Sequence, residues 1–95
     1  MFVIVLTYVK PMAMVERYLS EHAAFLDAQY AAGTFVASGR RVPRTGGVIL
    51  AAGIERAMLE DILERDPFKR EGIALFEIIE FTPTKMRAGF EAFVE

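Results

Sequence analysis

Cysteine is absent from this sequence of 95 residues, and histidine occurs only once. Without thiols the chain cannot form disulfides, offer a thiolate nucleophile or hold a sulfur-ligated metal. A single histidine without clustered carboxylates supplies too few ligands for a zinc site. The pair Gly46-Gly47 lacks the spacing and the following Lys-Ser or Lys-Thr of a phosphate-binding loop. We therefore expect no metal and no cofactor.

A surplus of positive charge is missing as well. Lys and Arg total 11 against 13 for Asp and Glu, which gives a net charge of -2. Nothing in this balance would neutralise a run of phosphates, so nucleic acid is not expected as a partner. The apolar segment from Met1 to Val9 is far shorter than the ~20 residues of a membrane span. No positively charged segment precedes it and no small-residue cleavage site follows it, so we expect a first strand and a cytoplasmic protein.

What the chain does contain is a globular composition, with 54% hydrophobic and 25% charged residues. A chain of this length is expected to be a single domain over residues 1–95, with a core over 1–83 and a tail over 84–95. Domains of this size bury only about 60–65% of the surface of their unfolded chains, so association would add stability.

Strand-like and helix-like segments alternate along the chain. β-Branched and aromatic runs predict strands, and apolar residues at helical spacing predict helices. Glycine and proline mark the ends of these segments. The expected elements are strands at Phe2–Val9, Thr34–Ser38 (ended by Gly39), Val48–Ala52 and Ile73–Phe81, helices at Met14–Ala32 and Glu55–Arg65, a loop at Gly39–Gly47, and a short helix or packed tail at Thr84–Glu95.

This order, β-α-β-β-α-β, predicts an α+β fold of the ferredoxin-like type. Such a fold has a four-stranded antiparallel sheet with both helices on one face, and right-handed crossovers make it the natural arrangement.

The second face of this sheet requires a cover. A sheet with one solvated face should alternate apolar and polar residues, but the first and third strands are apolar on both faces. In the fourth strand, Glu77 and Glu80 stand on opposite faces among apolar neighbours. We expect a second copy of the chain to cover this face in a two-fold homodimer. The alternative is that the tail folds back over part of the sheet.

His22 lies where a leucine would be expected. At about 100° per residue, it shares the core-facing stripe of the first helix with Val15, Leu19 and Leu26. A buried imidazole needs a hydrogen-bond partner. His22 is therefore either a reactive group or a core histidine bonded to a backbone carbonyl.

Asp66 is the best candidate partner for His22. It ends the second helix in an extended position before Pro67, and this fold sets the two helices side by side. A carboxylate that holds an imidazole fixes its tautomer and stabilises its cation, which suits a general base. The alternative is a turn residue, because Asp-Pro is common in turns.

The chain resembles the YCII-related domain family over residues 1–83. The resemblance is carried by the features in this series: the apolar first strand, His22, Gly33, Ser38-Gly39, Gly46-Gly47, Asp66-Pro67-Phe68 with Gly72, and the strand Glu77-Ile78-Ile79-Glu80-Phe81. It implies a dimeric α/β barrel and a histidine–aspartate pair in an active-site cleft, here His22 and Asp66. Some relatives are linked to dehydrochlorination of hydroxylated aromatics. The basic residues Arg40, Arg41 and Arg44 depart from the usual family pattern.

Four further residues are candidates for substrate binding. Ser38 could donate a hydrogen bond to a ligand and Gly39 could let the backbone approach it, although both would also suit a turn that ends a strand. Arg40, with Arg41 and Arg44, could form a rim that binds a carboxylate or phenolate, or simply a solvated loop. Tyr8 could present its hydroxyl to the same cleft or pack in the core.

These residues support three interpretations of function. The first is a cofactor-free enzyme in which His22 and Asp66 carry out acid–base chemistry of the lyase or isomerase type on a small aromatic or anionic molecule. The second is a homodimeric module that binds a small molecule without turnover. The third is a structural domain in which His22 is a satisfied core residue.

Overall fold

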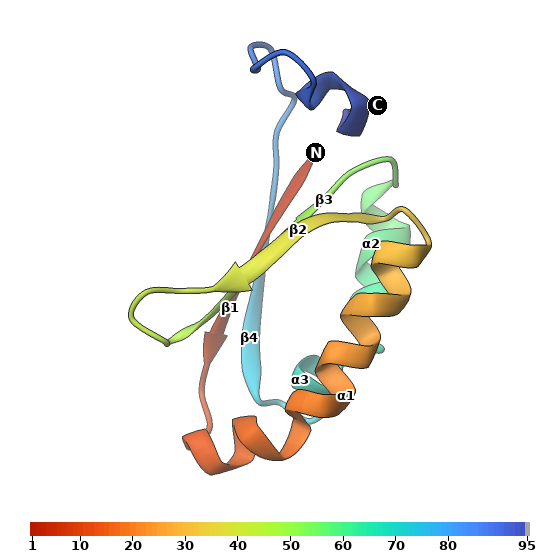
Figure 1. The fold of residues 1–95 in the computed structure, drawn as a ribbon. Helices are drawn as coiled ribbons and strands as arrows, with labels where there is room; N and C mark the ends of the chain where they lie inside the picture. The colour runs from red at the N-terminus through yellow and green to blue at the C-terminus, as the bar shows by residue number, and fades with distance from the viewer. Residues whose placement is uncertain (95) are drawn as a thin grey trace.

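Four strands form one antiparallel sheet, and the helices pack on one face of it. The computed structural model describes residues 1–94, so Glu95, the last residue of the expected tail, lies outside the described residues. The elements are β1 (Phe2–Tyr8), α1 (Met12–Ala31), β2 (Phe35–Arg40), β3 (Gly46–Ala51), α2 (Arg56–Leu63), α3 (Pro67–Arg70), β4 (Ala74–Glu80) and a 3-10 helix (Phe90–Phe93). Figure 1 shows the sheet from its edge with α1, α2 and α3 on the same side.

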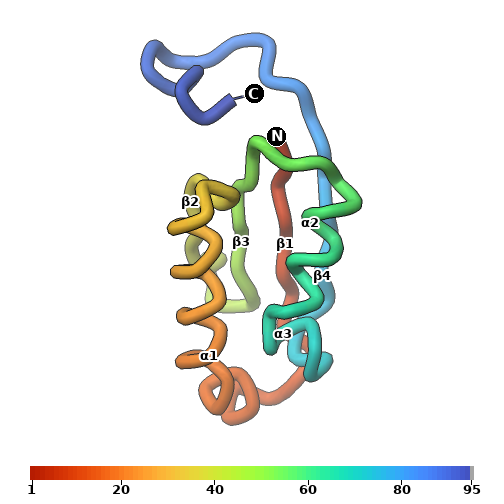
Figure 2. The backbone as a smooth tube through the Cα atoms, turned by 90° about the vertical axis from the view of Figure 1, so that its right-hand side faces the viewer, coloured from red at the N-terminus to blue at the C-terminus, as the bar shows by residue number. Residues whose placement is uncertain are grey.

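The strand order is β2-β3-β1-β4, and every neighbouring pair is antiparallel. This is the order in which the β2–β3 hairpin inserts beside β1, the split arrangement of ferredoxin-like folds. In Figure 2, α1 lies in front of β2 and α2 lies in front of β4, with β3 and β1 running between these two helices. The predicted ferredoxin-like α+β fold is confirmed.

Local sequence explains where α1 begins and ends. Pro11 precedes its first turn and cannot donate a backbone hydrogen bond, which the start of a helix does not require. At the other end Gly33 adopts a φ of 77°, a conformation that favours glycine. The amides of Gly33 and Thr34 donate to the carbonyls of Tyr30 and Gln29, each at 3.0 Å, so the helix closes in a Schellman motif.

The sequence prediction missed α3 and misplaced the hairpin boundaries. Helix α2 ends at Leu63, and Pro67 has the fixed φ that suits the first position of a new helix, so α3 starts directly after Asp66. The prediction that Gly39 ends the second strand was wrong. Gly39 pairs with Val48, and Arg40 pairs with Gly47, so the ladder continues and only residues 41–45 form the loop.

The core lies between the sheet and the helices. On β1, Phe2, Ile4 and Leu6 are buried and face the helices, whereas Val3 and Val5 on the opposite face are half-buried. The core cluster also draws apolar residues from α1, α2, α3, β2, β3 and β4. The alternation of burial along β1 therefore separates a covered face from an open one.

The open face of the sheet is apolar except for Thr7 and for Glu77, which stands between Leu75 and Ile79 on β4, and none of residues 1–94 covers this face over β4. There Leu75 is 65% exposed and Ile79 is 45% exposed. The tail does not fold back over this face as the alternative prediction required, because it passes beyond the end of the sheet where the N-terminus lies (Figure 1). Its last described residues, Ala92, Phe93 and Val94, line a hollow of about 1170 Å³ together with residues of the helix-covered side such as Tyr30. Within residues 1–94, no helix has the length and apolar character needed to cross a membrane.

Candidate functional site

His22 on α1 and Asp66 at the start of α3 form a hydrogen-bonded pair. The Nδ1 atom of His22 lies 2.8 Å from Oδ1 of Asp66, although the two residues are 44 positions apart in the sequence. The Asp66 side chain is fully buried and the His22 side chain is 14% exposed. The fold therefore brings together the two residues that the sequence selected as the candidate acid–base pair.

The start of α3 holds the Asp66 carboxylate in place. Asp66 is the N-cap of α3, and its Oδ1 accepts a hydrogen bond of 2.9 Å from the backbone amide of Phe68. Its backbone is extended, with φ -68° and ψ 124°, as expected before proline. Its second oxygen, Oδ2, is buried and has no hydrogen-bond partner among the described residues. All the polar contacts of this side chain therefore pass through one oxygen.

This arrangement selects the tautomer of His22. An ionised carboxylate can only accept hydrogen bonds, so beside an ionised Asp66 the Nδ1 atom of His22 is the donor and carries the proton. In the neutral imidazole the lone pair then resides on Nε2. Within residues 1–94, Nε2 makes no hydrogen bond, which leaves it available to a ligand.

Aromatic contacts set the orientation of the imidazole. The His22 ring stacks on Phe68 with centroids 4.1 Å apart and planes 11° apart. Tyr8 meets the same Phe68 ring edge-on, at 5.8 Å and 89°. Phe68 is almost completely buried, so it is a fixed surface against which both other rings pack.

An ion pair joins the two helices next to this site. The guanidinium of Arg70 on α3 donates to both carboxylate oxygens of Glu21 on α1, at 2.6 and 3.1 Å. The hydrogen bond from Arg70 lowers the pKa of Glu21. The hydrogen bonds to Glu21 and then to Glu71 raise the pKa of Arg70. Since Glu21 adjoins His22, this bidentate contact connects the elements that carry the acid–base pair.

His22 lines a cavity of about 290 Å³ between α1, α3 and the β2–β3 hairpin. The size is near the lower end of small-molecule sites. Its apolar wall includes Leu6, Leu19, Leu26, Ile49 and Phe68. All four predicted substrate-binding residues also line it, namely Tyr8, Ser38, Gly39 and Arg40. Asp66 does not line the cavity and lies behind His22 as its buried partner.

Comparison with protein families agrees with this description. The family model of the YCII-related domain matches residues 1–82. The chain belongs to the YCII-related family.

A solved structure with the same fold as this YCII-related chain is 5-chloro-2-hydroxyhydroquinone dehydrochlorinase from Burkholderia phenoliruptrix AC1100, in complex with 2,5-dihydroxybenzoquinone. The two share 15% sequence identity, with a TM-score of 0.70 over 85% of this chain and 93% of the other. At this identity the likeness shows the fold. A comparison with curated protein sequences finds no match.

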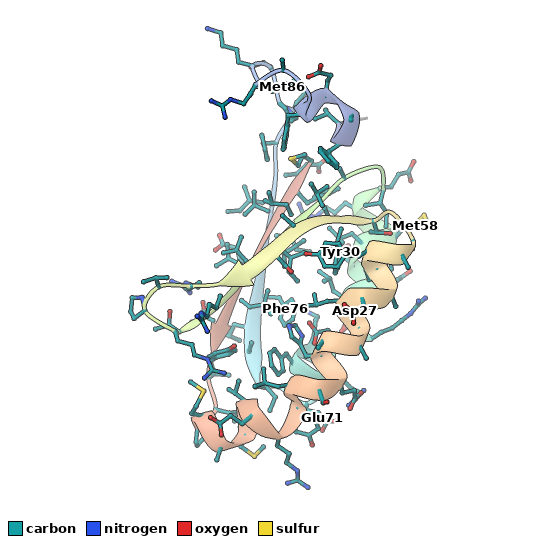
Figure 3. The ribbon with its side chains drawn as sticks, in the orientation of Figure 1. Asp27, Tyr30, Met58, Glu71, Phe76 and Met86 are labelled. Carbon is teal, nitrogen blue, oxygen red and sulfur yellow. The ribbon has the colours of Figure 1, made fainter. Side chains whose placement is uncertain are left out.

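Tyr30 is a partner of Ser38 that the sequence prediction for this YCII-related chain missed, although Tyr30 does not itself line the His22 cavity. Its hydroxyl and that of Ser38 share a hydrogen bond of 2.6 Å, and its side chain lies between α1 and β2 (Figure 3). Ser38 pairs with Ile49 in the middle of the ladder, so the alternative of a strand-ending turn was wrong. Tyr30 and Ser38 are eight residues apart, one near a helix end and one in the next strand, and this spacing alone does not predict their hydrogen bond.

The three arginines of the β2–β3 region of this YCII-related chain point to different places. Arg40 and Arg44 line the cavity. Arg41 does not, because its Nη1 donates to Thr7 Oγ1 at 2.9 Å on the exposed side of β1. Within the described residues, no three His, Asp or Glu side chains gather closely enough to hold a metal ion.

Proposed function

We propose that this chain is a small enzyme that uses no cofactor, with His22 as the group that moves a proton and Asp66 as its buried partner. The observation that carries the proposal is the 2.8 Å contact between His22 Nδ1 and a fully buried carboxylate, beside a cavity that His22 lines. Such a carboxylate stabilises the imidazolium that forms when Nε2 accepts a proton. Burial in the protein makes this stabilisation larger than in water.

The chemistry we propose is an elimination or isomerisation on a small hydroxylated ring or another enolisable molecule. Nε2 takes a proton from the substrate, and the electron pair of the broken bond forms a new double bond. In an elimination a leaving group such as chloride departs with its own electron pair, and in an isomerisation the imidazolium returns the proton at another atom. Both schemes balance without an oxidant or reductant. Support for this class comes from the dehydrochlorinase of the same fold, whose complex holds a hydroxylated quinone.

The test is a screen of chlorinated and unchlorinated hydroxyquinols for loss of absorbance and release of chloride. With a substrate found, His22→Ala should lower kcat by about 10²- to 10⁴-fold, the usual contribution of a positioned acid or base. Asp27→Ala is the matched control, since Asp27 is exposed on the same helix and does not line the cavity. A His22→Ala variant with full turnover would overturn the proposal.

The alternative is a module that binds a small molecule and does not transform it. One observation favours it: Asp66 caps α3, so this residue has a structural role whether or not the chain is catalytic. Under this alternative, a hydroxyquinol raises the melting temperature while mass spectrometry finds it unchanged. Conversion of the stabilising compound would exclude it.

We also propose that the chain acts as a homodimer paired through the open face of its sheet. Leu75 and Ile79, exposed on β4 beside the half-buried Val3 and Val5, are the apolar residues that a second copy would cover. Ile79→Lys should therefore yield monomers in analytical ultracentrifugation. Met58→Lys, a change at a 59% exposed position on α2, should leave the mass unchanged. A monomeric wild type would refute this pairing.

We also propose that the chain acts in the cytoplasm, as expected from the sequence. Growth of cells that carry a fluorescent fusion, followed by fractionation, tests this. Signal in an extracytoplasmic fraction would contradict it.

A further inference from the structure

The cavity next to His22 is positively charged on one side. Arg40 and Arg44 line it, and its lining includes no aspartate or glutamate. The chain as a whole carries a net charge of -2, so this concentration of positive charge is local. Within residues 1–94, neither arginine forms an ion pair with a carboxylate.

Other arginines of the molecule differ in this respect. Arg70 is held by Glu21 and Glu71, and Arg56 lies 3.7 Å from Glu60. Arg40 and Arg44 thus have unused guanidinium donors beside an otherwise largely apolar cavity. A guanidinium in this setting matches a carboxylate or another anionic oxygen, which it can bind through two parallel hydrogen bonds.

The spacing of residues along β2 sets the distance between Arg40 and Ser38 in the cavity. Ser38 and Arg40 lie on the same face of β2, two residues apart, which corresponds to about 6.5 Å along a strand. That spacing is comparable to the length of a six-membered ring with one substituent. An anionic group held by Arg40 therefore leaves room for a ring near Ser38 and His22.

Backbone hydrogen bonds hold the loop that carries Arg44. The amide of Tyr8 donates to the carbonyl of Thr45 at 2.9 Å, and the amide of Arg41 donates to the carbonyl of Gly46 at 3.0 Å. These bonds join both ends of the loop to the sheet. The loop is thus preorganised in the absence of ligand, which lowers the conformational entropy lost on binding.

We propose that Arg40 and Arg44 form an anion-binding subsite that selects small ring compounds carrying a carboxylate or an equally acidic oxygen. This inference rests on the proposed function, because it names the substrate class of the same cavity. The subsite binds the charged group, and the ring lies between His22 and the hydrogen-bonded Ser38. Arg40 and Arg44 are binding residues and take no part in proton transfer.

The experiment compares benzoate with benzamide, which has the same ring and a neutral amide in place of the carboxylate. Binding is followed by the NMR signals of His22, the only histidine of the chain. We expect the wild type to bind benzoate at least about tenfold more tightly than benzamide. Arg40→Gln and Arg44→Gln should each weaken benzoate binding by about tenfold or more, and leave benzamide binding unchanged.

Arg41→Gln is the matched control, because it removes the same charge from the same loop at a residue that faces Thr7. It should leave benzoate binding within about twofold of wild type. If Arg41→Gln and Arg44→Gln weaken benzoate binding equally, the effect comes from net charge alone and the proposal is overturned. Equal affinities for benzoate and benzamide, or no binding of benzoate, would overturn it too.

Benzoate has no leaving group to eliminate, so its binding is measured without turnover. If the proton-transfer chemistry of His22 is absent, the preference for benzoate remains and only the screen for product fails. If the subsite is absent, benzoate loses its advantage while a neutral hydroxyquinol is still transformed. The two failures are therefore distinguishable.

Discussion

Asp66 is the residue whose replacement tests the description of the site most directly. Its Oδ1 atom serves two donors, the Nδ1–H of His22 and the backbone amide of Phe68. Removing the cap of α3 in Asp66→Ala costs about 1 kcal/mol, as is typical of N-caps. Leaving the part-buried Nδ1–H of His22 without an acceptor costs about 1–3 kcal/mol more. We expect Asp66→Ala to lose about 2–4 kcal/mol of unfolding free energy in total.

Asp66→Asn separates these contacts from the charge. The amide oxygen of asparagine can accept from both donors, and its NH₂ group takes the position of Oδ2, which has no partner among the described residues. The change from charged to neutral hydrogen bonds costs about 1 kcal/mol, and the cost of the unpartnered NH₂ group is offset by the removal of a charge from a fully buried position. We therefore expect a stable protein with markedly reduced turnover, because the imidazolium no longer faces a carboxylate.

The assay is unfolding in urea, followed by circular dichroism at one fixed protein concentration so that association affects all variants equally. Asp27→Ala, at an exposed position on α1, provides the baseline and should change the free energy by less than about 0.5 kcal/mol. The reasoning is refuted if Asp66→Ala costs no more than Asp27→Ala. It is also refuted if Asn destabilises the chain as much as Ala does.

Two further predictions concern β3 and the helix contact. Gly46→Ala should destabilise the protein by about 2 kcal/mol or more in urea unfolding, because a Cβ there would lie 1.8 Å from the carbonyl oxygen of Leu6. Gly39→Ala, where a Cβ meets nothing within 4 Å, should change stability little, and equal losses would contradict this account. Glu21→Gln should lower the melting temperature at neutral pH, because Arg70 lowers the pKa of Glu21 and so stabilises its charged form in the folded state. This contribution to stability is complete above the ordinary pKa of 4.5 and is lost as the pH falls through the lower pKa of the folded state. The melting temperatures of wild type and variant should therefore converge in acid. A difference that stays constant with pH would contradict this explanation.

Local patterns of the sequence were sufficient for much of the fold. The dense apolar run of β1 and the glycine after α1 mark their elements, and the order of strands and helices implies the sheet topology. Two local features made His22 and Asp66 candidates, a polar residue on an apolar helix face and a residue before proline, and the resemblance to the YCII-related domain implied that they form a pair. Both signals are local, and the fold only had to place the two helical segments side by side.

Other features depend on tertiary contacts that local patterns do not encode. The helix α3 is four residues long, too short for a periodic signal, and only its cap and proline indicate it. Arg44 lines the cavity and Arg41 contacts Thr7 instead, and this difference depends on the path of a loop of five residues at the edge of the sheet. The contact between Tyr30 and Ser38 joins a helix to a strand through two hydroxyls whose spacing has no period.

In the enzyme proposed above, the loop between β2 and β3 binds substrate, whereas His22 and Asp66 on other elements transfer the proton. The base of this loop is held by the close approach of Gly46 to Leu6, whereas Val42 at its tip is 95% exposed. Exposed loop tips accept sequence change far better than buried positions do. The acid–base pair, by contrast, is tied to the cap of a helix and to the core. Exchange of residues 42–44 alone should therefore alter which small molecules bind in the cavity, while the contact between His22 and Asp66 and the fold of the domain stay the same.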